Sequence, residues 1–216
     1  MRRPRDPLSA HFFTMAVNSA WANRRILAAV ERLGEEALEV PTPSYFGSLS
    51  ATLNHVLTVD WFYVDALERA LRGEPPHERP ASFFDPEVPH PGLAPLRAAQ
   101  EEVDRRLMEL CSGLTPSALD TLVRIRRRGG ESRDPVTRLL AHLFQHQIHH
   151  RGQAHQLISA LAARDGVARD DTTAADPTSQ SAPPQLDEFF CVGDAPGRAD
   201  ELAALGLSER EVFGES

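Results

Sequence analysis

Four segments of the chain carry apolar residues at helical spacing, and this pattern limits the possible folds more than any other feature of the sequence. They run from Leu8 to Leu33, from about Leu49 to Leu71, from about Leu93 to Leu110, and from Asp134-Pro135 to about Ala163. Residues three or four positions apart share one face of a helix, so each segment would bury an apolar stripe against its neighbours. The pattern predicts an all-α fold.

Helix-capping and helix-breaking residues mark the ends of these segments. Gly34 would stop the first helix and Ser48 would cap the second, while the six prolines of residues 74–91 predict a loop after it. Asp134 suits the cap of the last helix, and Pro135 suits its first position, where the missing N–H costs no hydrogen bond.

The chain between the third and fourth segments has a different pattern. Thr115-Pro116 predicts one further helical turn. Apolar and basic residues then alternate from Leu122 to Arg126 before Gly129-Gly130, which predicts a small hairpin or an extended excursion. The arginines of residues 124–128 are interpreted as part of a solvated hairpin rather than as an anion site.

Charge and apolar runs exclude some classes of partner. The net charge of -8, from 31 acidic and 23 basic side chains, would repel a phosphate backbone, so no nucleic-acid partner is expected. The sequence has no run of about 18 apolar residues, so no membrane span is expected either. We therefore expect a cytoplasmic protein, in which Cys111 and Cys191 stay reduced and form no disulfide.

Four of the nine histidines lie between His142 and His150, on the last predicted helix. His146 and His150 are one turn apart and share a narrow arc with the leucines of that helix, so both imidazoles would face the core. An imidazole buried without a partner costs about 1 to 3 kcal/mol, and a shared metal ion would supply a partner. Hydrogen bonding within the core is the alternative. His142 and His149 lie to one side of the arc, and His155 lies well round the helix.

A third metal ligand would have to come from another helix, and His55 is the best candidate. It lies at the edge of the apolar arc of the second helix, which is compatible with a ligand but does not require one. Asp60 lies in the middle of that arc, where an ion pair is favoured over a hydrogen bond to a ligand imidazole. Gln147 stands where a metalloprotease helix has Glu, which disfavours hydrolysis of that type.

Four sequence segments together resemble the DinB/YfiT-like family, in the right order and over about Leu8 to Ala163. They are MAVNSAWAN at 15–23, YFGSL at 45–49, TLNHVLTVD at 52–60 and HQIHHRGQ at 146–153. The resemblance implies an up-down-down-up four-helix bundle, usually dimeric, with a zinc- or nickel-type ion held by three histidines. The family shares its name with an unrelated translesion polymerase, whose signature carboxylates are absent from this sequence.

Carried onto this chain, the family's metal ligands are His55, His146 and His150. Three imidazoles leave at least one coordination position open, as in a catalytic site. Characterised relatives such as mycothiol-dependent maleylpyruvate isomerase and bacillithiol S-transferases imply a metal-dependent thiol S-transferase or isomerase, which acts on a small electrophile with a low-molecular-weight thiol. The alternative is a stress-induced metal-binding dimer with a structural or sensing role. No catalytic residue is assigned, and Arg151 is expected to be solvated or ion-paired.

Apolar residues become sparse after Ala163. Residues 165–184 are rich in Asp, Thr, Ser, Ala and Pro, a composition that buries too little apolar surface to offset the ordering of the chain. We therefore predict a metal-binding bundle at 1–163, a flexible linker at 164–185, and a docking segment with a tail at 186–216. Leu186, Phe189, Phe190 and Val192 are candidates for docking. A terminal helix is possible at 199–213, and the tail is expected to trail in solvent rather than cap the metal site.

Overall fold

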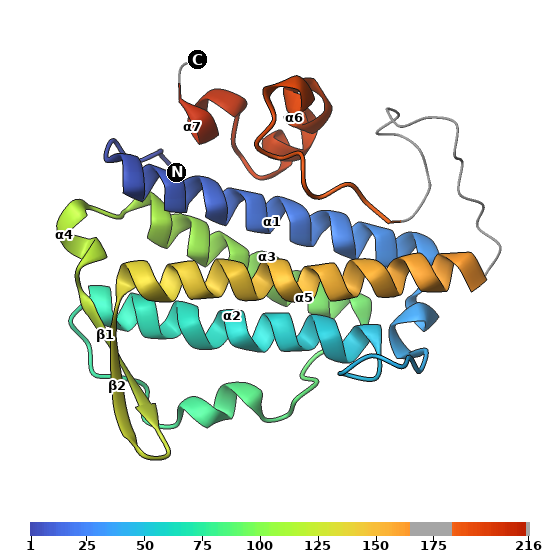
Figure 1. The fold of residues 1–216 in the computed structure, drawn as a ribbon, viewed down its shortest axis with the longest axis horizontal. Helices are drawn as coiled ribbons and strands as arrows, with labels where there is room; N and C mark the ends of the chain where they lie inside the picture. The colour runs from blue at the N-terminus through green and yellow to red at the C-terminus, as the bar shows by residue number, and fades with distance from the viewer. Residues whose placement is uncertain (165–182, 215–216) are drawn as a thin grey trace.

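Four long helices pack side by side and enclose the main core (Figure 1). The computed structural model describes residues 1–164 and 183–214. The long helices are α1 (Pro7–Leu33), α2 (Leu49–Leu71), α3 (Leu93–Ser112) and α5 (Val136–Arg164). Both α1 and α2 contact α3 and α5, so each long helix has two long neighbours. The prediction of a mainly helical chain is confirmed.

Local capping explains where the helices begin and end. The side chain of Asp6 accepts a hydrogen bond from the Ser9 amide at 2.9 Å, and that of Ser48 accepts one from the Ala51 amide at 3.1 Å. Gly34 follows α1 with φ 97°, a conformation that favours glycine. Residues 35–39 then form η1 (Glu35–Glu39). The predicted cap at Ser48 and stop at Gly34 are confirmed.

Three short elements fill the connections after α2 and α3. The proline-rich loop contains η2 (Pro80–Phe84). Later in the same loop, the backbone of His90 forms two 2.9 Å hydrogen bonds with the side chain of Asn54. The single turn predicted at Thr115-Pro116 is α4 (Pro116–Leu119). A hairpin of β1 (Leu122–Arg127) and β2 (Gly130–Pro135) follows, as the alternating pattern indicated.

The start of the last long helix differs from the prediction. Asp134 and Pro135 belong to β2, where they pair with Val123 and Leu122, and α5 begins at Val136. The Asp134 carboxylate lies 3.2 Å from the Arg138 guanidinium. The two residues that the local capping pattern assigned to the start of the helix therefore form the end of a strand.

The C-terminal residues lie against the outer side of α1 (Figure 1). They include η3 (Val192–Asp194), α6 (Ala195–Ala204) and α7 (Glu209–Phe213). Phe189 is 1% exposed and packs on Trp21 with 5.2 Å between ring centroids. Glu201 binds Trp21 and Arg25, and Thr14 donates to the Val212 carbonyl at 3.1 Å.

Two expectations for the C-terminal region can be judged from these contacts. Docking at Phe189 is confirmed, whereas Phe190 and Val192 are exposed. The expectation that the tail trails in solvent is wrong for residues 193–213, because Leu202 and Val212 are buried. The predicted linker lies largely outside the described residues. Among the residues described, no helix is both long and apolar enough to cross a membrane.

Candidate metal centre

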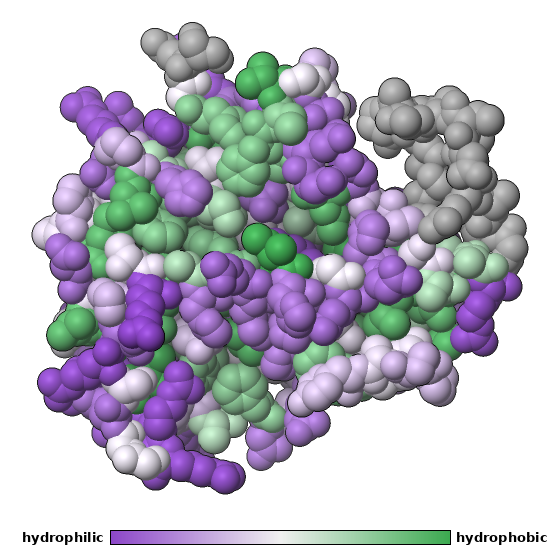
Figure 2. Space-filling model, viewed as in Figure 1, coloured by the Kyte–Doolittle hydropathy of each residue, from purple (hydrophilic) through white to green (hydrophobic). Residues whose placement is uncertain are grey.

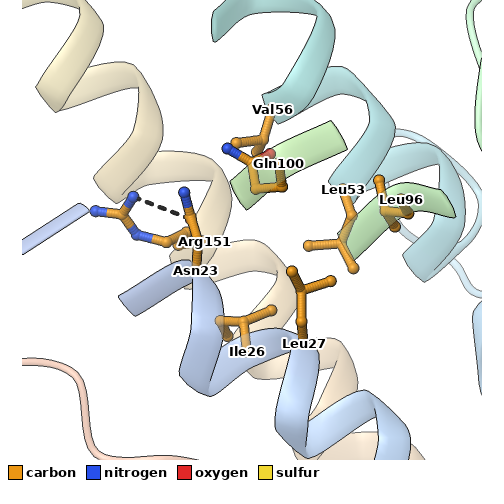
Figure 3. Close-up of a pocket in the computed structure, with 8 residues that line it drawn as sticks. All are labelled: Asn23, Ile26, Leu27, Leu53, Val56, Leu96, Gln100 and Arg151. Carbon is orange, nitrogen blue, oxygen red and sulfur yellow. Dashed lines mark hydrogen bonds between the residues drawn. The ribbon is translucent and has the colours of Figure 1, made fainter. Parts of the chain in front are cut away.

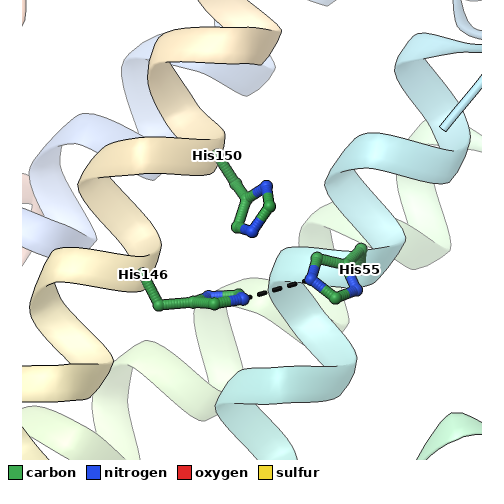
Figure 4. Close-up of side chains that lie close together, drawn as sticks. All are labelled: His55, His146 and His150. Atoms are coloured by element: carbon green, nitrogen blue, oxygen red, sulfur yellow. Dashed lines mark hydrogen bonds between the residues drawn. The ribbon is translucent and has the colours of Figure 1, made fainter. Parts of the chain in front are cut away.

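Three histidine side chains from two antiparallel helices meet beside the core (Figure 4). His55 comes from α2, and His146 and His150 come from α5. One ring nitrogen from each lies within 4.8 Å of the other two, and the Nε2 atoms of His55 and His146 are 3.1 Å apart. The i, i+4 spacing brings His146 and His150 to the side of α5 that faces α2. The structure therefore brings together the three residues that the sequence analysis selected.

The geometry of this cluster fits a divalent ion. Metal–nitrogen bonds of 2.0–2.1 Å in a tetrahedral site place two ligand nitrogens roughly 3.3 Å apart, close to the 3.1 Å between His55 and His146. Nδ1 of His150 lies 2.8 Å from Oε1 of Gln153. That contact makes Nδ1 the protonated nitrogen, which leaves Nε2 for an ion. Nδ1 of His146 has no partner among the described residues.

The cluster is also electrostatically suited to an ion. Burial, together with repulsion from His150, lowers the pKa of His55 to about 4. Burial and the neighbouring imidazoles lower the pKa of His146 to about 3, and burial lowers the pKa of His150 as well. All three rings are therefore neutral near pH 7, and neutral imidazole is the form that binds metal ions.

An aromatic edge borders the cluster. Phe46, from the loop before α2, lies with its ring centroid 4.6 Å from that of His55 and 5.4 Å from that of His150. Tyr45 stands edge-on to Phe46 at 4.9 Å and is 90% exposed. The sequence analysis noted these residues only within the family resemblance, because a loop has no periodicity from which their direction could be read.

The remaining histidines of α5 lie outside the cluster. His142 and His149 are exposed. The surface over α5 that faces the viewer in Figure 2 is largely hydrophilic. The His142 ring centroid is 6.1 Å from that of His146, and Nε2 of His149 lies 3.2 Å from the Gln153 amide nitrogen. His155 contacts the Pro184 carbonyl at 3.1 Å. These positions agree with the prediction that His142 and His149 lie to one side of the arc that carries His146 and His150.

Behind the cluster, seven buried side chains form a closed circuit of hydrogen bonds, which we call the polar ring. All four long helices contribute to it, and every member is at most 5% exposed. Its members are Ser19, Asn23, Asp60, Gln100, Asp104, Gln147 and Arg151. Sequence reasoning singled out Asp60 as a buried charge but missed the ring, because the polar partners of Asp60 lie on other helices.

Asp60 and Arg151 differ from their predicted roles. Asp60 accepts hydrogen bonds from Gln147 at 2.8 Å and from Gln100 at 2.9 Å, rather than forming a direct ion pair. Arg151 is 5% exposed and donates to Ser19 at 2.6 Å, so it is not solvated. It also borders a small cavity, whose polar side is formed with Asn23 and Gln100 (Figure 3). Three members of the polar ring therefore line the cavity, whereas none of the three clustered histidines does.

The two carboxylates of the ring have raised pKa values. Burial and the nearby Asp104 raise the pKa of Asp60 to about 7, and burial raises that of Asp104 to about 6. Burial lowers the pKa of Arg151 to about 10, so the guanidinium stays charged at neutral pH. One buried cation thus faces two carboxyl groups.

Acidification from pH 7 to pH 5 is expected to remove a stabilising contribution of the histidines. Because the folded-state pKa values of His55 and His146 lie below the ordinary 6.5, the unfolded chain binds protons that the folded chain does not. Stability from this source is present above pH 6.5 and declines as the pH falls towards 4. We expect roughly 1 kcal/mol per histidine at pH 5, allowing for partial exposure.

Asp60 and Asp104 change the folding stability in the opposite direction. Because their pKa values are raised in the folded protein, their contribution to stability increases as the pH falls. The histidine contribution is therefore measured by difference. Urea unfolding with a chelator, at pH 7 and pH 5, would compare the natural chain with a His55→Asn/His146→Asn variant. The same pH dependence in both chains would contradict the prediction.

Comparison with known proteins gives one match. The model of the DinB family matches residues 8–168. No curated protein and no solved structure matches the chain. The matched range contains the four long helices and all three clustered histidines, and it ends before the C-terminal residues that pack on α1.

Proposed function

This chain belongs to the DinB family, and on that basis we propose that it holds a divalent metal ion through His55, His146 and His150 and uses it in catalysis. The observation that carries the proposal is the convergence of three neutral imidazoles within 4.8 Å. Three ligands leave a coordination position for water or substrate, unlike the closed sites of structural zinc. Zinc or nickel suits an all-imidazole set.

We propose an up-down-down-up bundle as the frame of this site. Contacts along the helices support that topology. The start of α3 meets the end of α1 through Arg97 and Glu31, whereas its later part meets the later part of α2 through Arg106 and Glu68. Phe12 stacks on Phe144, and further along both helices Arg151 donates to Asn23, so α1 and α5 run in the same direction.

The proposed reaction is transfer of a low-molecular-weight thiol to a small electrophile, or isomerisation of an electrophile through such a thiol. A bound divalent ion would lower the pKa of a coordinated thiol or water and polarise a carbonyl group. In the transfer reaction a C–S bond forms, the leaving group departs with its electron pair, and the thiol proton passes to solvent. Gln153 would orient His150, and Phe46 would shield one side of the cluster from water.

Purified protein is expected to contain about one equivalent of metal and to conjugate monobromobimane with a thiol. Cysteine, glutathione, mycothiol and bacillithiol would be offered in turn, with bromide release and the bimane adduct as readouts. We expect at least a tenfold rate loss after chelation, in line with loss of a Lewis acid. Chelation that unfolds the protein, without turnover of any of the four thiols, would instead favour the stress-related structural or sensing role.

The remaining parts of the proposal concern partners and location. We propose a homodimer in the cytoplasm that takes small molecules rather than nucleic acid or membranes. The net charge of -8 supports the exclusion of nucleic acid, and the hairpin arginine Arg124 is already paired with Glu131. Light scattering would test the dimer, and filter binding at low salt would test the exclusion of nucleic acid.

A further inference from the structure

On α5, each clustered histidine is followed directly by a member of the polar ring. His146 precedes Gln147, and His150 precedes Arg151. The histidine side chains lie towards His55 of α2 and are partly exposed, whereas the following side chains turn into the core. A 100° step between successive helical residues produces this division. The same two turns of α5 therefore carry both the candidate ligands and two members of the polar ring.

Gln147, on α5, is hydrogen-bonded to Asp60, on α2, and so joins the two helices that carry the clustered histidines. It is 0% exposed, and its Nε2 donates to Oδ1 of Asp60 at 2.8 Å. Its Oε1 accepts from Ser19 on α1, so both ends of the amide are fixed. The second oxygen of Asp60 accepts from Gln100 on α3. Neither member of the Gln147–Asp60 link can turn freely.

The precision required of a metal site explains why such a link matters. Metal–ligand distances vary by only about 0.2 Å, whereas one residue along a helix is about 1.5 Å. The hydrophobic effect is not directional, so burial of apolar surface alone defines the register of α2 against α5 less sharply. A hydrogen bond requires a donor–acceptor distance of about 2.7–3.2 Å and a preferred angle, so it tolerates less displacement. The link thus restricts sliding and rotation of α5 against α2.

We infer that Gln147 and Asp60 are positioning residues, whose hydrogen bond holds α2 and α5 in the register at which His55 meets His146 and His150. This inference rests on the proposed metal site. It also gives position 147 a role unlike that of the metalloprotease Glu, because its side chain points into the core and away from the cluster.

Two nearly isosteric variants separate positioning from general stabilisation. Gln147→Met removes one of the two amides that donate to Asp60, and with it the hydrogen bond between α5 and α2, the helices of the clustered histidines. Asn23→Leu removes one of the two amide donors of Asp104, between α1 and α3, and the 3.3 Å contact with Arg151, but it leaves the Gln147–Asp60 link in place. We expect Gln147→Met to weaken Zn²⁺ binding 10- to 100-fold, as loss of outer contacts does at metal sites, and Asn23→Leu to change it less than about threefold.

The measurements are Zn²⁺ affinity by chelator competition, the visible spectrum of the Co²⁺ form, and urea unfolding of the metal-free protein. Equal losses of metal affinity in both variants, or no loss in either, would overturn the inference. If the natural chain itself binds no Zn²⁺ or Co²⁺, the proposed function fails and the inference fails with it. Tight binding by the natural chain with an unaffected Gln147→Met variant rejects the positioning role alone.

A second pair of variants keeps the test decisive if Gln147→Met does not fold. Asp60→Asn keeps the shape of the side chain but offers one acceptor oxygen to two amide donors. Adding Gln147→Glu restores the link with donor and acceptor exchanged. We expect Asp60→Asn to weaken Zn²⁺ binding and the double variant to recover it to within about threefold of the natural chain. Failure of the double variant to recover affinity, while it folds, would contradict the inference.

Discussion

Replacing His146 with alanine is expected to weaken Zn²⁺ binding by about 100- to 1,000-fold. Zinc sites in small proteins contribute roughly 10 to 16 kcal/mol, so loss of one imidazole among a few ligands removes about 3 to 4 kcal/mol. His146 is in contact with both other members of the cluster, because its Nε2 lies 3.1 Å from Nε2 of His55 and its ring centroid lies 4.3 Å from that of His150. Metal analysis and competition with a chromogenic chelator would measure the loss.

His142→Ala is the matched control for this measurement. His142 lies one turn before His146 on the same helix, but its side chain is exposed and lies outside the cluster. We expect its replacement to change Zn²⁺ affinity less than about threefold, because no ligand is removed. If His142→Ala and His146→Ala bind Zn²⁺ equally well, the ion is held elsewhere or is bound only by the surface histidines.

The long helices could be predicted because their signals are local. Ser48 and Gly34 act within one turn of the chain, and the apolar repeat needs no knowledge of the partner helix. Asp134-Pro135 shows the limit of that reasoning, since pairing with Val123 and Leu122 on the preceding strand takes precedence over a good capping sequence. Tertiary pairing cannot be read from a local pattern.

The metal site was predictable only in part, because contacts between helices cannot be read from a local pattern either. The i, i+4 spacing placed His146 and His150 on one face, whereas His55 depended on the family resemblance, because the edge of an apolar arc does not define a direction. The Gln147–Asp60 link was missed. A buried amide and a buried carboxylate are recognisable only once their partners on other helices are known.

The C-terminal residues show that a few apolar side chains can dock a segment when they pack on an existing apolar surface, here that of α1. Leu202, Leu207 and Val212 lie in a segment with few large apolar residues, yet all three are buried and belong to the same apolar core as Phe189. The side chain of Arg198, 2% exposed, donates to the Cys191 carbonyl at 2.9 Å and binds Glu209, which joins α6 to the start of α7. Composition alone underestimated this order because it counts residues and not their contacts.

Phe189→Ala is therefore expected to lower the free energy of unfolding by about 3 kcal/mol, the lower part of the range for removing a buried phenylalanine. The ring is 1% exposed and packs on Trp21 and, at 5.5 Å, on Phe213. Phe190→Ala is the matched control, because that ring is 48% exposed, and its loss should cost less than about 1 kcal/mol. Urea unfolding would measure both.

The physical cause of the Phe189→Ala loss can be tested through the neighbouring tryptophan. If the C-terminal residues leave α1, the 3%-exposed Trp21 becomes hydrated, and its fluorescence should shift to longer wavelength before global unfolding. The three clustered histidines lie on α2 and α5, so Zn²⁺ affinity should stay within about threefold of the natural value. A Phe189→Ala protein as stable as Phe190→Ala would mean that the C-terminal residues contribute little to folding, and loss of Zn²⁺ binding would mean that α1 transmits their docking to the metal site.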